Sequence, residues 1–167
     1  MTDNNEAAAQ AQQPQGGQLG IQKIYVKDLS FESPNAPQIF RGEWQPHVDV
    51  QLANKAQKLE DDVYEVTLTV TVTVKHEEQT SYLIEVQQAG VFTITGFQEQ
   101  HTTAMMATVC PNILFPFARE AISDVATRGG FPQLLLAPVN FEAMYAQELQ
   151  RQQAAASEPE NTEVSTH

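Results

Sequence analysis

Side chains that could carry out catalysis or hold a metal are spread thinly along this chain. The four histidines are His47, His76, His101 and His167, and the one cysteine is Cys110. Zinc sites usually show paired ligands at short, fixed spacings, such as two histidines four residues apart on a helix. His101 and Cys110 are nine residues apart and have no second pair beside them. The sequence therefore predicts no metal site, and we expect no cofactor.

Cys110 is the strongest candidate for a nucleophile. It precedes an expected helix, whose first turn could lower the pKa of the thiol. No histidine and acid accompany it in the motif, so a small buried residue is the favoured interpretation. The acidic pairs at 61–62 and 77–78 are typical of solvated turns beside a strand rather than of an acid–base dyad. The glycines at 129–130 lack the pattern of a phosphate-binding loop. Together these residues do not predict an enzyme.

The composition indicates one acidic domain. The chain has 167 residues, with 9 Lys and Arg against 21 Asp and Glu, for a net charge of −12. Such a balance disfavours nucleic-acid binding, and it suits a basic partner or simply keeps the protein in solution. One cysteine permits no intrachain disulfide, the first residues lack the basic and apolar regions expected of a signal peptide, and no apolar run approaches the ~18 residues of a membrane span. We expect a cytoplasmic protein that does not insert into membranes.

The clearest structural pattern lies at residues 63–74, VYEVTLTVTVTV. Strict alternation predicts a β-strand, and its apolar and threonine-rich faces indicate an antiparallel sheet with one buried side and one wet side. Further strands are predicted at 21–33, after Pro46, and at 80–95, where a turn at 76–79 implies a hairpin. Gly90 inside the last strand suggests a bulge or bend.

The same alternation assigns side chains to faces of the sheet. In the second strand Val48, Val50 and Leu52 are expected to face inward, and in the fourth strand Leu83 and Glu85 share the outer face. In the first strand an unbroken period of two divides the residues into two sets. One set is Tyr25, Lys27, Leu29 and Phe31, and the other is Ile24, Val26, Asp28, Ser30 and Glu32.

Helices follow the strands. A short helix is predicted at 98–109, and a longer one has Pro111 in its first turn, a kink near Pro116 and its end at the glycines 129–130. Prolines keep 131–141 from being helical, and Asn140 can then cap a last helix with one apolar stripe. The fold class is α+β, a four-stranded antiparallel sheet followed by helices packed on one face. We expect disordered tails at 1–18 and 152–167 around a folded domain at 19–151.

Two surfaces of this fold are unusual. The helices and the segment 131–141 are more apolar than one small sheet can bury, which favours an oligomer or a contact surface. The outer sheet face places Leu83 among acids, an arrangement that resembles a docking site with an apolar centre and a charged rim.

These segments together resemble the bacterial protein-export chaperone family SecB. The resemblance rests on residues 22–37, 43–52, 61–73, 85–92, 110–120 and 128–145, in that order. It implies a SecB-like homotetramer, a dimer of dimers, that holds unfolded precursor proteins in a translocation-competent state without ATP. It also implies delivery of these clients to the SecA ATPase of the Sec export pathway.

The resemblance further implies roles for individual residues. SecA would bind the acidic sheet face at Asp28, Glu32, Leu83 and Glu85. Clients would bind a groove lined by Trp44, Phe131, Leu134, Leu135, Leu136, Phe141, Met144 and Tyr145.

Taken without the resemblance, the residues leave two other functions open. One is a small enzyme that uses Asp or His in a cleft between subunits, which would need a carboxylate or imidazole of perturbed pKa. The other is a structural subunit, in which the segment 131–141 would be buried inside the oligomer.

Overall fold

The structure is a computed structural model that describes residues 16–157. Of the tails expected at 1–18 and 152–167, residues 1–15 and 158–167 lie outside the described residues. The elements are, in order, β1 (Gln18–Glu32), the 3₁₀ helix η1 (Gln38–Arg41), β2 (Pro46–Glu60), β3 (Val63–His76), β4 (Gln79–Thr95), α1 (Glu99–Ala107), α2 (Val109–Arg128) and α3 (Phe141–Ser157). Four antiparallel strands precede the helices, so the predicted α+β class is confirmed.

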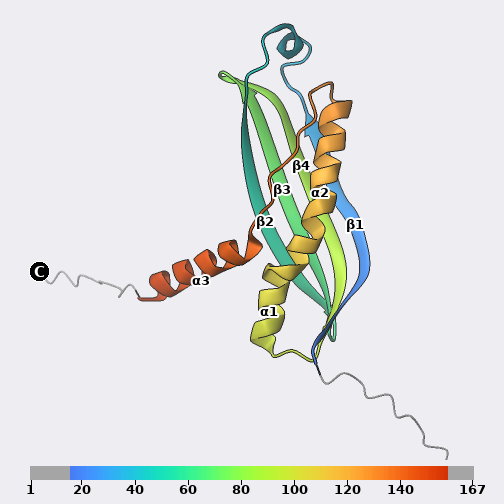
Figure 1. Cartoon of the computed structure of the whole chain (residues 1–167), viewed down its shortest axis with the longest axis vertical. Helices are drawn as coiled ribbons and strands as arrows, with labels where there is room; N and C mark the ends of the chain where they lie inside the picture. Colours follow the sequence, from blue (N-terminus) through green and yellow to red (C-terminus); the bar gives the residue numbers. More distant parts are fainter. Residues whose placement is uncertain (1–15, 158–167) are drawn as a thin grey trace, which may run out of the picture.

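The strands form one sheet in the order β1-β4-β3-β2 (Figure 1). Two-residue turns join β2 to β3 and β3 to β4, and each contains a residue at positive φ, Asp62 at 61° and Glu77 at 52°. Because both central strands come from tight hairpins, β1 and β2 are left as the two edges of the sheet.

The core lies between the central strands and α2. Val66, Leu68, Val70 and Val72 of β3 are fully buried, as the alternation predicts, and β4 contributes Tyr82 and Ile84. Helix α2 packs along β4 and β3, burying Cys110, Leu114, Ala118 and Ile122. One helix covers two strands, so the apolar side chains of β1 and β2 stay partly exposed on the same face.

The alternation predicted for the first strand is wrong in one respect. Register shifts between Ile21 and Lys23 and between Val26 and Asp28 show that β1 carries two bulges. Val26 pairs with Gln88 on the helix side, whereas Asp28 pairs with Gln87 on the opposite side. An extra residue in a bulge reverses the face of every side chain beyond it. Val26 and Asp28 therefore lie on opposite faces, although we expected them on one.

Gly90 was expected to mark a bulge or a bend, and β4 has no bulge there, because the nearby irregularities lie in β1. A side chain at Gly90 would approach the ring of Phe92 to 2.7 Å and Leu114 of α2 to 3.1 Å. The glycine allows close packing of the helix on the sheet. At the other end of α2, Gly130 adopts φ +87° and the Phe131 N–H bonds the carbonyl of Ala126 at 3.1 Å, as the predicted C-cap requires.

The last helix is longer than expected. Its start is as predicted, because the Asn140 side chain accepts a bond of 2.9 Å from the Ala143 N–H. Its end is not, since residues 152–157, expected in the disordered tail, continue α3 to Ser157. This stretch is rich in alanine and glutamine, which favour helix. Figure 1 shows α3 projecting away from the β2 edge of the sheet.

A polar cluster ties β1 to β3 across β4. The Tyr25 hydroxyl donates to a Glu65 carboxylate oxygen, and Lys27 Nζ donates to both oxygens of that carboxylate at 2.9 Å. These donors lower the pKa of Glu65, and the bond to Glu65 raises the pKa of Tyr25 to about 12.

Replacing Glu65 with Gln should therefore destabilise the protein in a pH-dependent way. A depressed carboxyl pKa stabilises the fold above its ordinary value of 4.5, and this contribution is lost as pH falls below it. Glu65→Gln should cost about 1–2 kcal/mol at pH 7 in urea unfolding. The difference from the parent should shrink below pH 4.5.

Tyr25→Phe tests the same cluster at alkaline pH. A raised tyrosine pKa contributes stability that is present below pH 10 and lost toward pH 12. This variant should lose less stability than the parent over that alkaline interval. A loss from Glu65→Gln that stays constant from pH 7 to pH 3 would show that the charge of Glu65 does not contribute to stability.

Candidate functional site

The four residues predicted to bind SecA lie on one face of the sheet. Glu32 of β1 pairs with Leu83 of β4, and Ser30 pairs with Glu85, while Asp28 lies one pair further along. Directly paired residues share a face, and the bulge before Asp28 places both Asp28 and Glu32, which alternation keeps together, on the outer face of the sheet. Asp28 and Glu32 are exposed, and Leu83 and Glu85 are half-buried.

The row of pairs continues beyond these four residues to the far edge. Leu83 also pairs with Thr73, which pairs with Asp49 of β2. Glu85 is held in place by the Thr71 hydroxyl, which donates to its carboxylate at 3.2 Å. An apolar side chain therefore sits in a strip with carboxylates at both edges. Asp49 alternates with Val48 and Val50, which were expected to face inward, but it was not predicted to belong to the patch, because pairing partners cannot be read from one strand.

The opposite end of this face carries lysines as well as acids. Lys23 pairs with Val91, Lys55 pairs with Thr67, and Lys27 reaches Glu65. The outer face is thus acidic toward the β3–β4 hairpin and of mixed charge toward the other end of the strands, where Glu60 and Glu65 accompany the lysines.

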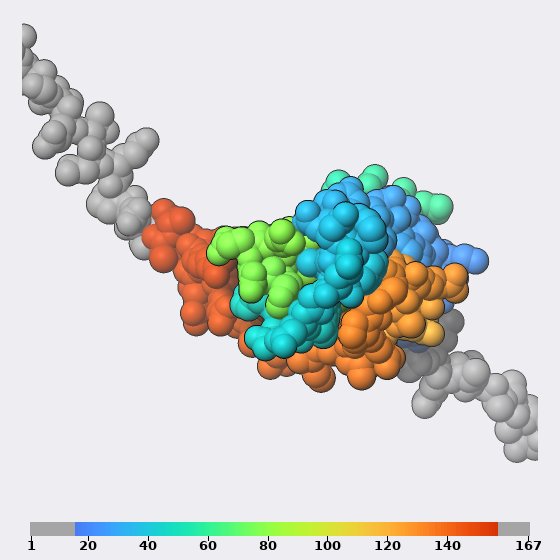
Figure 2. Space-filling model, turned by 90° about the horizontal axis from the view of Figure 1, so that it is seen from above, coloured from blue at the N-terminus to red at the C-terminus, as the bar shows by residue number. Residues whose placement is uncertain are grey.

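An aromatic cluster occupies the hairpin end of the helix side. The ring of Phe131 lies 5.5 Å from Trp44, 5.0 Å from Phe40 and 4.5 Å from Tyr82, measured between ring centroids. Figure 2 looks down on this end, where the segment after β1 lies beside the end of α2. Phe131 is buried, whereas Trp44 is 37% and Phe40 49% exposed. Phe40 was missed because η1 is too short to show a pattern.

A separate groove lies between β2 and α3. It has a volume of about 450 Å³ and is lined by Leu52 and Asn54 of β2, by Leu68, and by Phe141, Met144 and Tyr145 of α3, among others. Met144 is 42% exposed and Phe141 is buried. The Asn54 side chain donates to the Met106 carbonyl at 2.9 Å, which fixes one end of the groove.

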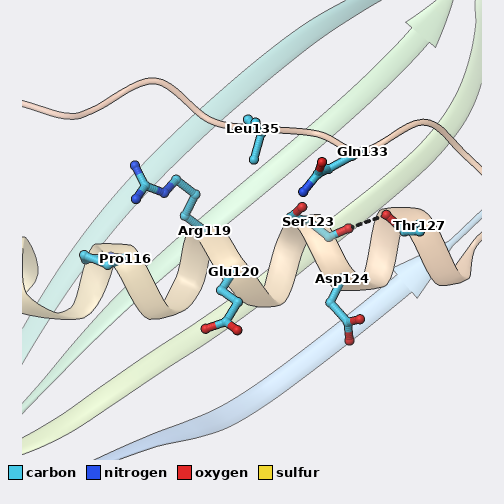
Figure 3. A pocket seen from close by; sticks show the side chains of 8 residues that line it. All are labelled: Pro116, Arg119, Glu120, Ser123, Asp124, Thr127, Gln133 and Leu135. Atoms are coloured by element: carbon cyan, nitrogen blue, oxygen red, sulfur yellow. Dashed lines mark hydrogen bonds between the residues drawn. The ribbon is translucent and has the colours of Figure 1, made fainter.

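The leucines of the segment 131–141 that were predicted to bind clients lie in two different environments. Leu136 is buried in the core and Leu134 packs against it. Leu135 is 70% exposed and lines a cleft of about 520 Å³ with α2. Figure 3 shows Leu135 and Gln133 beside the face of α2 that carries Arg119 and Ser123. The structure thus brings Trp44 together with Phe131, and Phe141 with Met144 and Tyr145, but it does not bring Leu135 to either group.

Residues considered for catalysis are not assembled into a site. Cys110 is fully buried, and burial raises its pKa to about 12, the reverse of what a nucleophile needs. Within residues 16–157, no group of three or more His, Cys, Asp or Glu side chains could hold a metal ion. No helix in the same range is long and apolar enough to cross a membrane.

Comparison with known proteins identifies the family. The family described as preprotein translocase subunit SecB matches residues 9–152. The chain belongs to the SecB family. Protein-export protein SecB of Methylococcus capsulatus is 53% identical over 150 residues, covering 89% of this chain and 96% of the relative. The SecB of Stutzerimonas stutzeri is 52% identical over 155 residues, covering 93% of this chain and 94% of its own.

A solved structure shares the fold. A SecB-like chaperone of Mycobacterium tuberculosis, in complex with an antitoxin peptide, aligns with a TM-score of 0.62 and 19% identity. The alignment covers 73% of this chain and 91% of that one. The SecB fold predicted from the sequence is therefore confirmed, and the roles of individual site residues remain predictions.

Two neighbouring leucines offer a direct check of the segment's geometry. Leu136→Ala should cost about 2–4 kcal/mol in urea unfolding, because it leaves a cavity in the core. Leu135→Ala should change stability by less than about 0.5 kcal/mol, because its side chain is largely in solvent. Equal losses for the two variants would contradict the alternation that the structure shows.

Proposed function

We propose that this chain is an ATP-independent chaperone of the Sec export pathway, which holds unfolded precursor proteins and delivers them to the SecA ATPase. Membership of the SecB family supports the export role. The single observation that carries the holding role is the partly exposed apolar surface along β2, α3 and the aromatic cluster, beside a core that is already complete. Exposed patches of this kind mark contact surfaces.

The chemistry of this surface suits many different clients. Apolar contact is non-directional, and the methionine and aromatic side chains adapt to different shapes or bury large areas. Trp44, Phe40 and Met144 provide such side chains on the helix side of the sheet. Binding of this type needs no nucleotide and no cofactor, and we propose that the protein is not an enzyme.

The proposed SecA site lies on the other side of the sheet. Asp28, Glu32 and Glu85 share the outer face with Leu83, and this charge fits a basic partner surface. We further propose that the protein works in the cytoplasm as a homotetramer, a dimer of dimers. The uncovered apolar side chains of β1, such as Ile21 and Val26, support self-association.

Met144→Asp should weaken client holding about 10-fold or more, because a Met contact in the groove contributes roughly 1.5–3 kcal/mol. The measurement is suppression of aggregation of an unfolded client without nucleotide, followed with increasing chaperone concentration. Gln150→Asp adds the same charge to α3 outside the groove and should hold clients like the parent. Light scattering should give about four times the 18.5 kDa chain mass for all three proteins. Undiminished holding by a tetrameric Met144→Asp would remove the groove from the proposal.

Asp28→Lys should slow association with SecA and leave client holding unchanged. Exposed charges mainly steer encounter, and salt screens them within about 8 Å at physiological ionic strength. The defect should therefore shrink as salt rises, whereas the defect of Leu83→Arg should persist because it removes apolar contact. Association rates over a salt series measure both. Joint loss of SecA binding and holding in a tetrameric Asp28→Lys variant would contradict a division between two faces.

A further inference from the structure

The segment 33–45 joins the two edge strands across the hairpin end of the sheet and carries Phe40 and Trp44 of the aromatic cluster (Figure 1). Its own backbone bonds run between residues three or four apart, such as the bond from the Ile39 N–H to the Asn35 carbonyl at 3.0 Å. Two of its residues are prolines, which have no N–H to donate. Bonds of this local kind shape the segment but do not fix its position over the sheet.

Two side chains hold the beginning of this segment to β4. The Ser33 hydroxyl donates to the Ser81 carbonyl at 2.8 Å, and the Asn35 amide donates to the Thr80 carbonyl at 2.9 Å. All four residues are buried or half-buried, so water competes little for these bonds. The two bonds begin where the pairing of β1 with β4 ends. Side chains therefore continue the attachment of the chain to β4 after the strand itself has stopped.

A bulge in β4 presents both carbonyls to the segment. In a regular strand successive carbonyls point to opposite sides, so Thr80 and Ser81 would not both face the chain that leaves β1. The pairing with β3 shifts at this point, since Tyr82 pairs with Val74 but Thr80 pairs with Lys75. This shift leaves Ser81 as an extra residue, and such a residue bends the strand locally. The bulge thus provides two neighbouring acceptors for Ser33 and Asn35.

Asn35 has a second role, because it also determines where η1 begins. Its carbonyl accepts the bond from Ile39, so the residue whose side chain is held by β4 also opens the turn that carries Phe40. The ring of Phe40 in turn lies 5.0 Å from that of Phe131. The position of Phe40 over Phe131 therefore depends on Asn35 through a single helical turn.

The other end of the segment makes a weaker contact with the same hairpin. Nδ1 of His76 lies 3.2 Å from the carbonyl oxygen and 3.4 Å from the backbone nitrogen of Gln45. This contact is exposed, so exchange with water leaves it a smaller net contribution. The half-buried bonds of Ser33 and Asn35 are thus the stronger constraint on where the segment lies.

We propose that Asn35 is a positioning residue for the client surface, because its amide holds the segment 33–45 so that Phe40 and Trp44 lie against Phe131. The inference rests on the proposed chaperone function, and Asn35 acts through the two aromatic side chains rather than on the client. A cluster that is already closed costs less ordering free energy when a client binds. If the segment is released, the apparent affinity falls with the fraction of molecules in which the cluster is closed.

The emission of Trp44, the single tryptophan of the chain, provides the first test. Asn35→Asp keeps the shape of the side chain but replaces the donor with a carboxylate facing the Thr80 carbonyl. In the full-length protein without client, its emission should shift to longer wavelength and be quenched more strongly by acrylamide. Asn54→Asp removes the same kind of bond, to the Met106 carbonyl at 2.9 Å, and should leave the emission unchanged. Parent-like emission of Asn35→Asp would overturn the proposal.

Client affinity provides the second test. The probe is fluorescently labelled α-lactalbumin that is kept unfolded by reduction and carboxymethylation, and its anisotropy is followed during titration with each variant at equal oligomer mass. Asn35→Asp should bind about 5-fold more weakly than the parent, since one hydrogen bond contributes about that factor. Ser33→Ala should act in the same direction, and it keeps the test decisive if Asn35→Asp does not fold.

A matched core variant separates positioning from a general loss of stability. Ile122→Val removes one buried methyl group from α2, destabilises the protein, and leaves the segment 33–45 untouched. It should bind the probe like the parent and keep the Trp44 emission of the parent. A loss of affinity equal to that of Asn35→Asp would overturn the proposal, because stability alone would then explain the effect.

Failure of the proposed function gives a different result. If the parent neither binds the probe nor suppresses aggregation, the chaperone function fails, and the inference falls with it. If the parent does both, and Asn35→Asp changes the Trp44 emission without weakening the binding of the probe, the function stands and only the positioning role fails.

Discussion

A single helix covers a four-stranded sheet, and this mismatch in width determines what the molecule exposes. Strands lie about 4.8 Å apart and a helix with its side chains is about 10 Å across, so one helix covers roughly two strands. Helix α2 lies over β4 and β3, whose apolar faces are fully buried. Val26 on β1 and Val50 on β2 follow the same apolar pattern but stay exposed. The surfaces proposed for assembly and for clients are the two parts of the sheet that the helix does not reach.

The sheet also separates the proposed activities. Alternation sends Leu83 to one side and Ile84 to the other within two residues, so the proposed SecA face and the client side are joined covalently but share no surface side chains. A client on the helix side leaves the acidic face open. Simultaneous engagement of both partners, which a delivery step requires, is therefore compatible with the fold without any rearrangement.

The sequence was most informative where one local rule applied over many residues. The alternation of β3, the cap at Asn140 and the left-handed Gly130 were all readable, because each depends on neighbouring residues alone. The bulges of β1 could not be predicted in this way, because the extra residues at 22 and 27 are recognised only from the pairing of β1 with β4.

The candidate site shows the same division between local and distant information. Residues 134, 135 and 136 are all leucine, so their identity cannot predict which of them is exposed. The path of the extended segment over the core decides that Leu135 reaches solvent. Phe40 and Asp49 escaped notice because their importance comes from partners distant in sequence, Phe131 for one and Leu83 for the other.

The bulge at Lys27 has a further consequence for the outer face. It leaves Asp28 and Glu32 beside Glu85 at one end, while Lys23 and Lys27 face the same way toward the other end. The face is therefore acidic toward the hairpin and of mixed charge at the opposite end. An uneven distribution of charge of this kind favours one orientation of a charged partner over the reverse. The distribution of charge on this face thus bears on the direction in which a docked partner points along the strands, and not only on whether it docks.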